Sequence, residues 1–179
     1  KPSMMSIDLS AADSVALPVD QPLDVPDSLI LGIDKLLDAY YSLGNALSED
    51  DVASALASAS KVLASIGEIQ AHDLSETTKK RWLKDTKQLT DVLSAISKTD
   101  DLSEIRVQFA LLSEVMIAIV ESYGSGVRVF RLHCPMAFNN RGADWLQNDD
   151  QTRNPYFGSA MYKCGDVVQT YEISQNSIE

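Results

Sequence analysis

Two cysteines and two methionines near the C-terminal end of this 179-residue chain are the residues best suited to chemistry. Cys134 and Met136 lie in the stretch HCPM, and Met161 and Cys164 lie in the stretch MYKCG. Thiolates and thioethers are soft ligands that match polarisable ions such as Cu(I) or Ag(I), whereas Mg²⁺ and Ca²⁺ prefer oxygen. Zinc fits less well, because methionine rarely serves as a zinc ligand. The four residues therefore predict a soft-metal site if the two stretches converge.

Two predicted strands would bring these stretches together. Segments 127–133 (VRVFRLH) and 166–173 (DVVQTYEI) alternate apolar and polar residues, so we expect a hairpin-like pairing at the ends of the loop 134–165. A loop of this length is usually functional, or organised locally by something other than regular secondary structure. The C-terminal part is thus predicted to be a small hairpin and loop module that carries cysteine and methionine.

Strand alternation predicts which side chains share a face around Cys134. His133 would point to the opposite face, which favours a surface or hydrogen-bonding role for it, with metal ligation as the alternative. Pro135 would extend the chain, so that Met136 returns to the Cys134 face.

The spacing at the far end of the loop also favours convergence. Met161 and Cys164 are three residues apart, a separation that one turn brings together, and Gly165 would let the backbone reverse directly afterwards.

The same proximity would also serve a disulfide. Outside the cytosol two cysteines commonly pair, and closing the loop of about 30 residues between Cys134 and Cys164 would stabilise the fold by roughly 3.5 kcal/mol. The alternatives for the two cysteines are metal binding, a disulfide alone and inert thiols. The ordinary role of the two methionines would be to fill the core.

Four amphipathic helices are predicted before this module. In each helix apolar residues recur every three or four positions. The first helix is expected to start at Asp27 and the second at Ser48, which begins a capping-box-like sequence. The third is expected to start at Asp73 or Ser75, and the fourth to run from Asp100 or Asp101 to Tyr123. The positions expected to face inward in the second helix include Val52, Leu56, Ala59, Leu63 and Ile66.

Short connections between these helices indicate an up-and-down four-helix bundle, hence a mainly α fold. We expect a linker or extended arm over residues 1–26, the bundle over 27–124 and the hairpin module over 125–179. The six residues expected deep in the bundle core are Leu36, Tyr40, Leu89, Phe109, Leu112 and Met116.

The composition excludes several classes of partner. A net charge of −11 argues against nucleic acid and anionic membranes, since both require a basic patch. No apolar run approaches the roughly 20 residues that span a bilayer, so we expect a soluble chain without direct membrane insertion. The chain begins at Lys1 and has no signal peptide, so we expect a processed or excised fragment.

The sequence does not predict an enzyme. His72 and His133 are the only histidines, and no nucleophile–histidine–carboxylate set, phosphate-binding glycine loop or inward carboxylate pair is evident.

The stretches HCPMAFNNRGADWLQ and RNPYFGSAMYKCG, with the helical stretch before them, resemble the domain of unknown function 3347. That domain is found alone or at the C-terminus of periplasmic adaptor subunits of heavy-metal efflux pumps, in the membrane fusion protein family. The resemblance spans roughly residues 27–173. The CPM and MxxCG pair is also similar to the small heavy-metal-binding modules of copper exporters, with Met161 in place of one of their cysteines.

The resemblance implies a periplasmic accessory domain that binds Cu(I) or Ag(I) and passes it to the pump by ligand exchange. Its expected partners are components of the efflux adaptor and pump or a metallochaperone. The alternative is a structural protein-interaction domain stapled by a Cys134–Cys164 disulfide.

Overall fold

The computed structural model describes residues 23–174, so the expected arm over 1–26 lies almost entirely outside the described residues. Four long helices are followed by a small sheet. The elements are α1 (Asp27–Ser48), α2 (Val52–Glu68), α3 (Glu76–Ile96), α4 (Leu102–Tyr123), β1 (Val129–Cys134), α5 (Ala137–Asn140), β2 (Ala143–Gln147), the 3₁₀ helix η1 (Gly158–Ala160) and β3 (Asp166–Tyr171).

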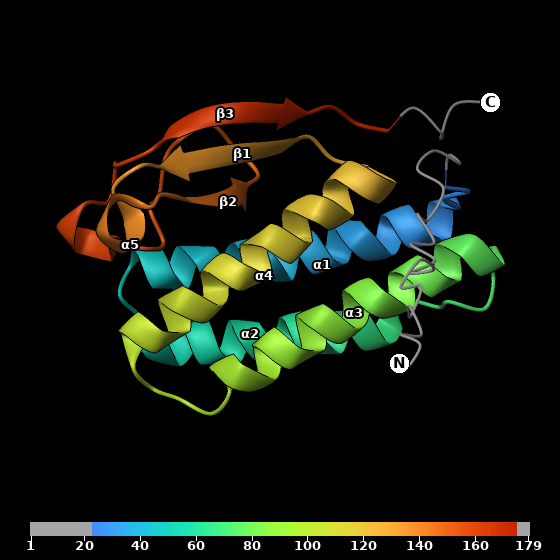
Figure 1. The fold of residues 1–179 in the computed structure, drawn as a ribbon, viewed down its shortest axis with the longest axis horizontal. Helices are drawn as coiled ribbons and strands as arrows, with labels where there is room; N and C mark the ends of the chain where they lie inside the picture. Colours follow the sequence, from blue (N-terminus) through green and yellow to red (C-terminus); the bar gives the residue numbers. More distant parts are fainter. Residues whose placement is uncertain (1–22, 175–179) are drawn as a thin grey trace, which may run out of the picture.

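The four long helices form the predicted bundle. Each packs against the next along the chain, and α1 also packs against α4, which closes the arrangement (Figure 1). All six residues expected deep in the core have 0% exposed surface, which confirms the helical seams: Leu36, Tyr40, Leu89, Phe109, Leu112 and Met116. Within residues 23–174, no helix is both long and apolar enough to cross a bilayer.

The start of the second helix differs from the capping box expected at Ser48. Ser48 is buried and still belongs to α1, where its hydroxyl donates to the Asn45 carbonyl oxygen at 2.7 Å. Asp51 caps α2 instead, because its carboxylate accepts the backbone N–H of Ser54 at 2.9 Å. The intervening Asp50 adopts a φ of 60°, which turns the chain between the two helices.

The prediction for one inward-facing residue of α2 was also wrong. Leu63 is 43% exposed, whereas its neighbour Val62 is fully buried. The buried face of α2 begins with small residues, Ala55, Ser58 and Ala59, which let this helix approach its neighbours closely. The helix is therefore rotated slightly from the orientation that its larger side chains suggested.

The expected pairing of two strands is confirmed, and a third strand was missed. β1 lies in the centre of an antiparallel sheet of order β2-β1-β3, and its partner β3 is the second predicted strand. β2, with the sequence ADWLQ, lies inside the segment expected to lack regular secondary structure. Of the three strands, β2 lies closest to α1 and α4, and β3 lies farthest from the helices (Figure 1).

Tyr40 connects the bundle to the sheet. Its hydroxyl lies 2.6 Å from the Ser113 hydroxyl and accepts the backbone N–H of Leu146, in β2, at 3.2 Å. Burial raises the pKa of Tyr40, so the phenol stays protonated and available for this polar contact. The orientation of the C-terminal module is thus set partly by a side chain of α1.

Candidate functional site

The two cysteines meet at the end of the sheet. Cys134 Sγ and Cys164 Sγ lie 3.3 Å apart, and both are free thiols. Cys134 is completely buried at the end of β1, whereas Cys164 is half-buried in the segment that leads into β3. The hydrogen bond with Cys134, together with burial, raises the pKa of the Cys164 thiol. The pair therefore holds at least one proton that a bound cation would displace.

The turn expected around Met161 and Cys164 is present. The backbone N–H of Cys164 donates to the Met161 carbonyl oxygen at 3.0 Å, which places the two residues on one turn. Gly165 follows with a φ of +129°, and a Cβ there would lie 3.0 Å from the His133 carbonyl oxygen and 2.7 Å from the Trp145 ring. Glycine is thus required where the chain passes β1 on its way into β3.

Met136 occupies a different position from the one predicted by strand alternation. β1 ends at Cys134, and Pro135 and Met136 form a turn instead of extending the strand. Met136 has helical backbone angles and is 45% exposed, so core filling does not explain it. The strand ends two residues before Met136, so alternation does not return this side chain to the Cys134 face.

His133 lies apart from the thiol pair, as alternation predicts. Its Nδ1 donates to Asp144 Oδ1 at 2.5 Å, across the β1–β2 pair. Asp144 Oδ2 in turn accepts a hydrogen bond from Nε–H of Arg131 at 2.7 Å. The imidazole therefore has a hydrogen-bonding role in a polar cluster separate from the sulfur atoms.

Asn154 organises the segment that carries Cys164. It is fully buried, its amide nitrogen donates to the Cys164 carbonyl oxygen at 2.7 Å, and its amide oxygen accepts the backbone N–H groups of Tyr156 and Phe157. Its own N–H donates to the Tyr162 carbonyl oxygen at 2.8 Å. The Asn154 side chain thus supplies hydrogen bonds to backbone groups that have no partner in a sheet.

The same segment is fastened to the helices by Arg106, a residue that sequence reasoning missed. Its guanidinium donates to the carbonyl oxygens of Leu47 and Pro155, both at 2.8 Å, and to Asp50 Oδ1 at 2.6 Å. Asp50 also accepts the backbone N–H of Ser159 at 3.1 Å. The hydrogen bond from the Ser159 hydroxyl, then that from Arg106 and then that from the Ser159 backbone N–H, lower the pKa of Asp50.

Tyr156 is the centre of a small aromatic cluster in the C-terminal module. Its ring contacts those of Phe138, Trp145 and Phe109, at centroid distances of 5.4, 5.8 and 6.0 Å. Because Phe109 belongs to α4, the aromatic cluster is continuous with the bundle core.

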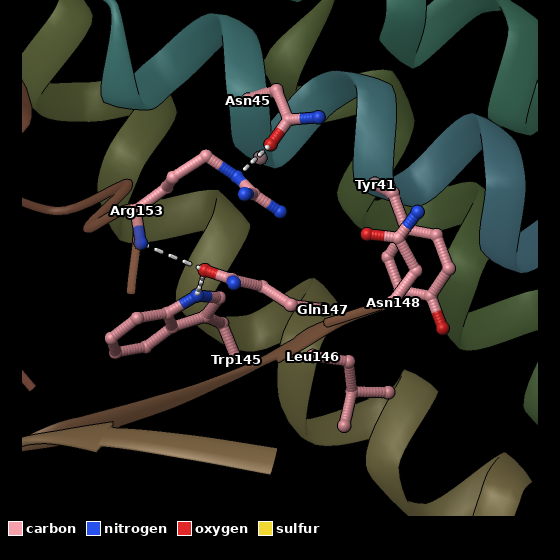
Figure 2. Close-up of a pocket in the computed structure, with 8 residues that line it drawn as sticks. Tyr41, Asn45, Trp145, Leu146, Gln147, Asn148 and Arg153 are labelled. Carbon is pink, nitrogen blue, oxygen red and sulfur yellow. Dashed lines mark hydrogen bonds between the residues drawn. The ribbon is translucent and has the colours of Figure 1, made fainter. Parts of the chain in front are cut away.

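A second polar network ties β2 to α1 (Figure 2). The Gln147 amide oxygen accepts Trp145 Nε1–H at 2.9 Å and the Arg153 backbone N–H at 3.0 Å. The Arg153 side chain extends to Asn45 Oδ1 at 3.0 Å. The cavity beside this network measures about 10 Å³, room for a single water molecule, so it is a structural junction and not a ligand site.

The arrangement offers two soft sulfur ligands side by side, shielded on one side by the core. Within residues 23–174, no three side chains of His, Cys, Asp or Glu are grouped so that they could hold a metal ion. Any ion at the thiol pair would therefore depend on sulfur ligands.

The helical part of the chain matches the model of a known protein family. The family model described as a protein of unknown function (DUF3347) matches residues 36–127, just over half of the chain. This range covers most of α1, all of α2, α3 and α4, and ends before β1. Neither a curated protein nor a solved structure shows significant similarity to the chain.

Proposed function

The chain belongs to the DUF3347 family of proteins of unknown function, and from the geometry of its thiol pair we propose that it binds a soft monovalent ion, Cu(I) or Ag(I). The observation that carries the proposal is the 3.3 Å separation of Cys134 Sγ and Cys164 Sγ. Two sulfur atoms this close can serve one ion with only small side-chain movements. Thiolates favour Cu(I) among the common soft ions.

The surroundings of the pair support a monovalent ion over zinc. Structural zinc sites hold four ligands drawn mainly from cysteine, histidine and carboxylates. The described residues provide no group of three such side chains, so a zinc ion here would keep an incomplete coordination shell. Cu(I) and Ag(I) accept thioethers, and the turn that holds Cys164 begins with Met161.

The exposure of the sulfur residues supports exchange of the ion. Cys134 is fully buried, Cys164 is half-buried and Met136 is 45% exposed, so the proposed ligands range from the interior to the surface. An incoming ion would meet the half-buried Cys164 thiol before the fully buried Cys134 thiol. Binding would release thiol protons, because only the thiolate is a strong ligand.

For the biological setting we propose an accessory domain of a periplasmic heavy-metal efflux adaptor. The domain would accept the ion from a metallochaperone or from solution and pass it to pump components by ligand exchange. Its role would be binding and transfer without catalysis.

The second candidate is a structural interaction domain stapled by a disulfide. The same 3.3 Å separation favours it, because a small movement would bring the sulfurs to the bonding distance of about 2.05 Å. A disulfide would hold the segment from Pro135 to Lys163 against the bundle without involving either methionine.

A thiol assay followed by a Cu(I) titration separates the two candidates. The chain is purified without reductant, its free thiols are counted, and the reduced protein is titrated anaerobically against a colorimetric Cu(I) chelator. We expect one Cu(I) per reduced chain, and affinity at least about 100-fold weaker in Cys134→Ala and in Cys164→Ser, a loss of about 2.7 kcal/mol.

Circular dichroism establishes that each variant is folded. Failure of the reduced wild type to compete with the chelator would refute the metal proposal. Absence of free thiols before reduction, combined with that failure, would establish the disulfide staple.

A further inference from the structure

The two thiols of the pair differ in how far a reagent from solution can reach them. Cys134 is completely buried at the end of β1 and belongs to the hydrophobic core. Cys164 is half-buried in the segment that leads into β3. These are the only two cysteines of the chain, so its thiol chemistry falls on them alone. Without opening of the core, a reagent in solution can therefore approach only the sulfur of Cys164.

The backbone that carries Cys164 is held in place by hydrogen bonds. Its N–H donates to the Met161 carbonyl oxygen at 3.0 Å, and its carbonyl oxygen accepts the Asn154 amide at 2.7 Å. The next carbonyl oxygen, that of Gly165, accepts the Thr152 hydroxyl at 2.9 Å. Movement of the Cys164 sulfur is thus mainly rotation of its own side chain, and the sulfur stays beside Cys134 when a group is attached to it.

The sulfurs are also placed for bond formation. They lie 3.3 Å apart, so reaching the disulfide length requires a shift of about 1.2 Å. Disulfides form by attack of a thiolate on a disulfide sulfur, through a mixed disulfide. Cys134 Sγ lies on the core side of Cys164 Sγ, and a group attached from solution would lie on the outer side. The attacking and leaving sulfurs are therefore on opposite sides of Cys164 Sγ, as this substitution requires.

We propose that the pair is a directional thiol–disulfide exchange centre, in which Cys164 reacts with a small disulfide from solution and Cys134 resolves the product. In the first step the Cys164 thiolate attacks one sulfur of the disulfide RSSR, the bond from Cys164 to SR forms, and RS⁻ leaves. In the second step the Cys134 thiolate attacks Cys164 Sγ, the Cys134–Cys164 bond forms, and the second RS⁻ leaves. The chain loses two electrons, and RSSR becomes two RSH that carry the two thiol protons.

The same route makes the bridge reversible. A small thiol can reach the Cys134–Cys164 disulfide only at Cys164 Sγ, so reduction begins at the sulfur where oxidation began. The bridge is then one state of a switch and not a permanent staple. One consequence rests on the proposed Cu(I) site: oxidation would remove both thiolates and so release the ion, because the thiolate is the metal ligand.

The test uses the full chain, reduced and free of metal, so Cu(I) affinity does not enter it. Oxidised glutathione is added, samples are quenched with acid over time, and mass spectrometry of the intact chain and of its peptides locates each adduct. In wild type we expect a transient glutathione adduct on Cys164, followed by the Cys134–Cys164 disulfide. Cys134→Ala should keep one glutathione on Cys164, because no resolving thiol remains. The wild-type time course gives the order of events even if Cys134→Ala proves unstable.

Cys164→Ser is the matched variant for the buried thiol. Cys134 would react only when the core opens locally, so this folded variant should be modified at least about 100-fold more slowly than wild type. The same variant unfolded in urea should take up glutathione on Cys134, which would identify burial as the cause of the protection. Circular dichroism establishes that the variant is folded in buffer.

Several results would overturn the proposal. These are a first adduct on Cys134, a lasting adduct on Cys164 of the wild type, or equal modification rates in folded wild type and Cys164→Ser. Failure of folded wild type to react with millimolar oxidised glutathione, while the urea-unfolded chain reacts, would overturn it as well. Because no metal is present, these results leave the Cu(I) proposal to its own titration.

Discussion

Arg106, on α4, donates a hydrogen bond to the carbonyl oxygen of Pro155 at 2.8 Å, although the two residues are 49 positions apart. The same guanidinium is paired with Asp50 at 2.6 Å, and its side chain is only 14% exposed. Arg106 therefore anchors the segment that leads to Cys164 to α4, at a point where that segment has no strand partner. The position of the half-buried thiol depends on this contact as well as on the sheet.

The Asp50 contact predicts an acid-sensitive contribution to stability. Hydrogen bonds from Ser159, and then from Arg106, lower the pKa of Asp50 below its ordinary value of 3.8 in the folded protein. A carboxyl with a lowered folded-state pKa contributes stability above the unfolded pKa and loses it as pH falls through the folded one. The free-energy difference between wild type and Asp50→Asn should therefore be constant near neutral pH and shrink in acid below pH 3.8.

Urea unfolding at a series of pH values measures this difference. Asparagine tolerates the positive φ of residue 50, so Asp50→Asn removes the charge with little backbone strain. The Ser159 hydroxyl donates to Asp50 Oδ2 at 2.5 Å, so Ser159→Ala should remove part of the same pH dependence. Ser60→Ala should not, because the Ser60 hydroxyl bonds only within α2, to Leu56. A difference between wild type and Asp50→Asn that does not vary with pH would contradict the assignment.

Phe109→Ala should destabilise the protein by about 3 to 5 kcal/mol. Phe109 is completely buried, its ring stacks on Tyr40 at a centroid distance of 5.1 Å, and it also contacts Tyr156. The substitution would leave a cavity where the bundle core meets the aromatic cluster of the module. Chemical denaturation provides the measurement. Val107→Ala on the same helix, at 46% exposure, should change stability by no more than about 0.5 kcal/mol.

The methionines distinguish an ion site from a disulfide. Met136→Leu combined with Met161→Leu nearly preserves volume, so the reduced double variant should melt close to wild type. Its Cu(I) affinity should fall at least about tenfold, or roughly 1.4 kcal/mol, since a soft ion loses thioether ligands. Met116→Leu is the control, because Met116 is fully buried in α4 and should not affect binding.

Competition against a Cu(I) chelator measures the affinities. Equal affinity in the double variant and wild type would show that neither thioether takes part, and the site would then consist of the two thiolates alone.

The helical part of the fold was predictable because its signal is local. Apolar residues spaced three and four apart determine which face of each helix is buried, and the six predicted core residues are all buried. The exception, Leu63, lies on α2, where small residues and not large ones face the neighbouring helices. In such a helix the spacing of large apolar side chains is a poorer guide to which face is buried.

The convergence of Cys134 and Cys164 was also predictable, since two alternating strands on either side of a long loop favour pairing. The third strand was not, because its five residues do not alternate clearly and its pairing with β1 follows from their position in the fold. Without β2 the sequence could not indicate that Asp144 lies opposite His133.

The amino-acid sequence by itself determined the helices, their buried seams and the soft character of the residues near the C-terminus. Only the tertiary structure decided the partners of Arg106, the orientation of His133 and the exposed position of Met136. The physical reason is that helix and strand periodicity arises from neighbours along the chain, whereas these contacts join side chains to groups on other elements. Their geometry exists only once the sheet has docked on α1 and α4.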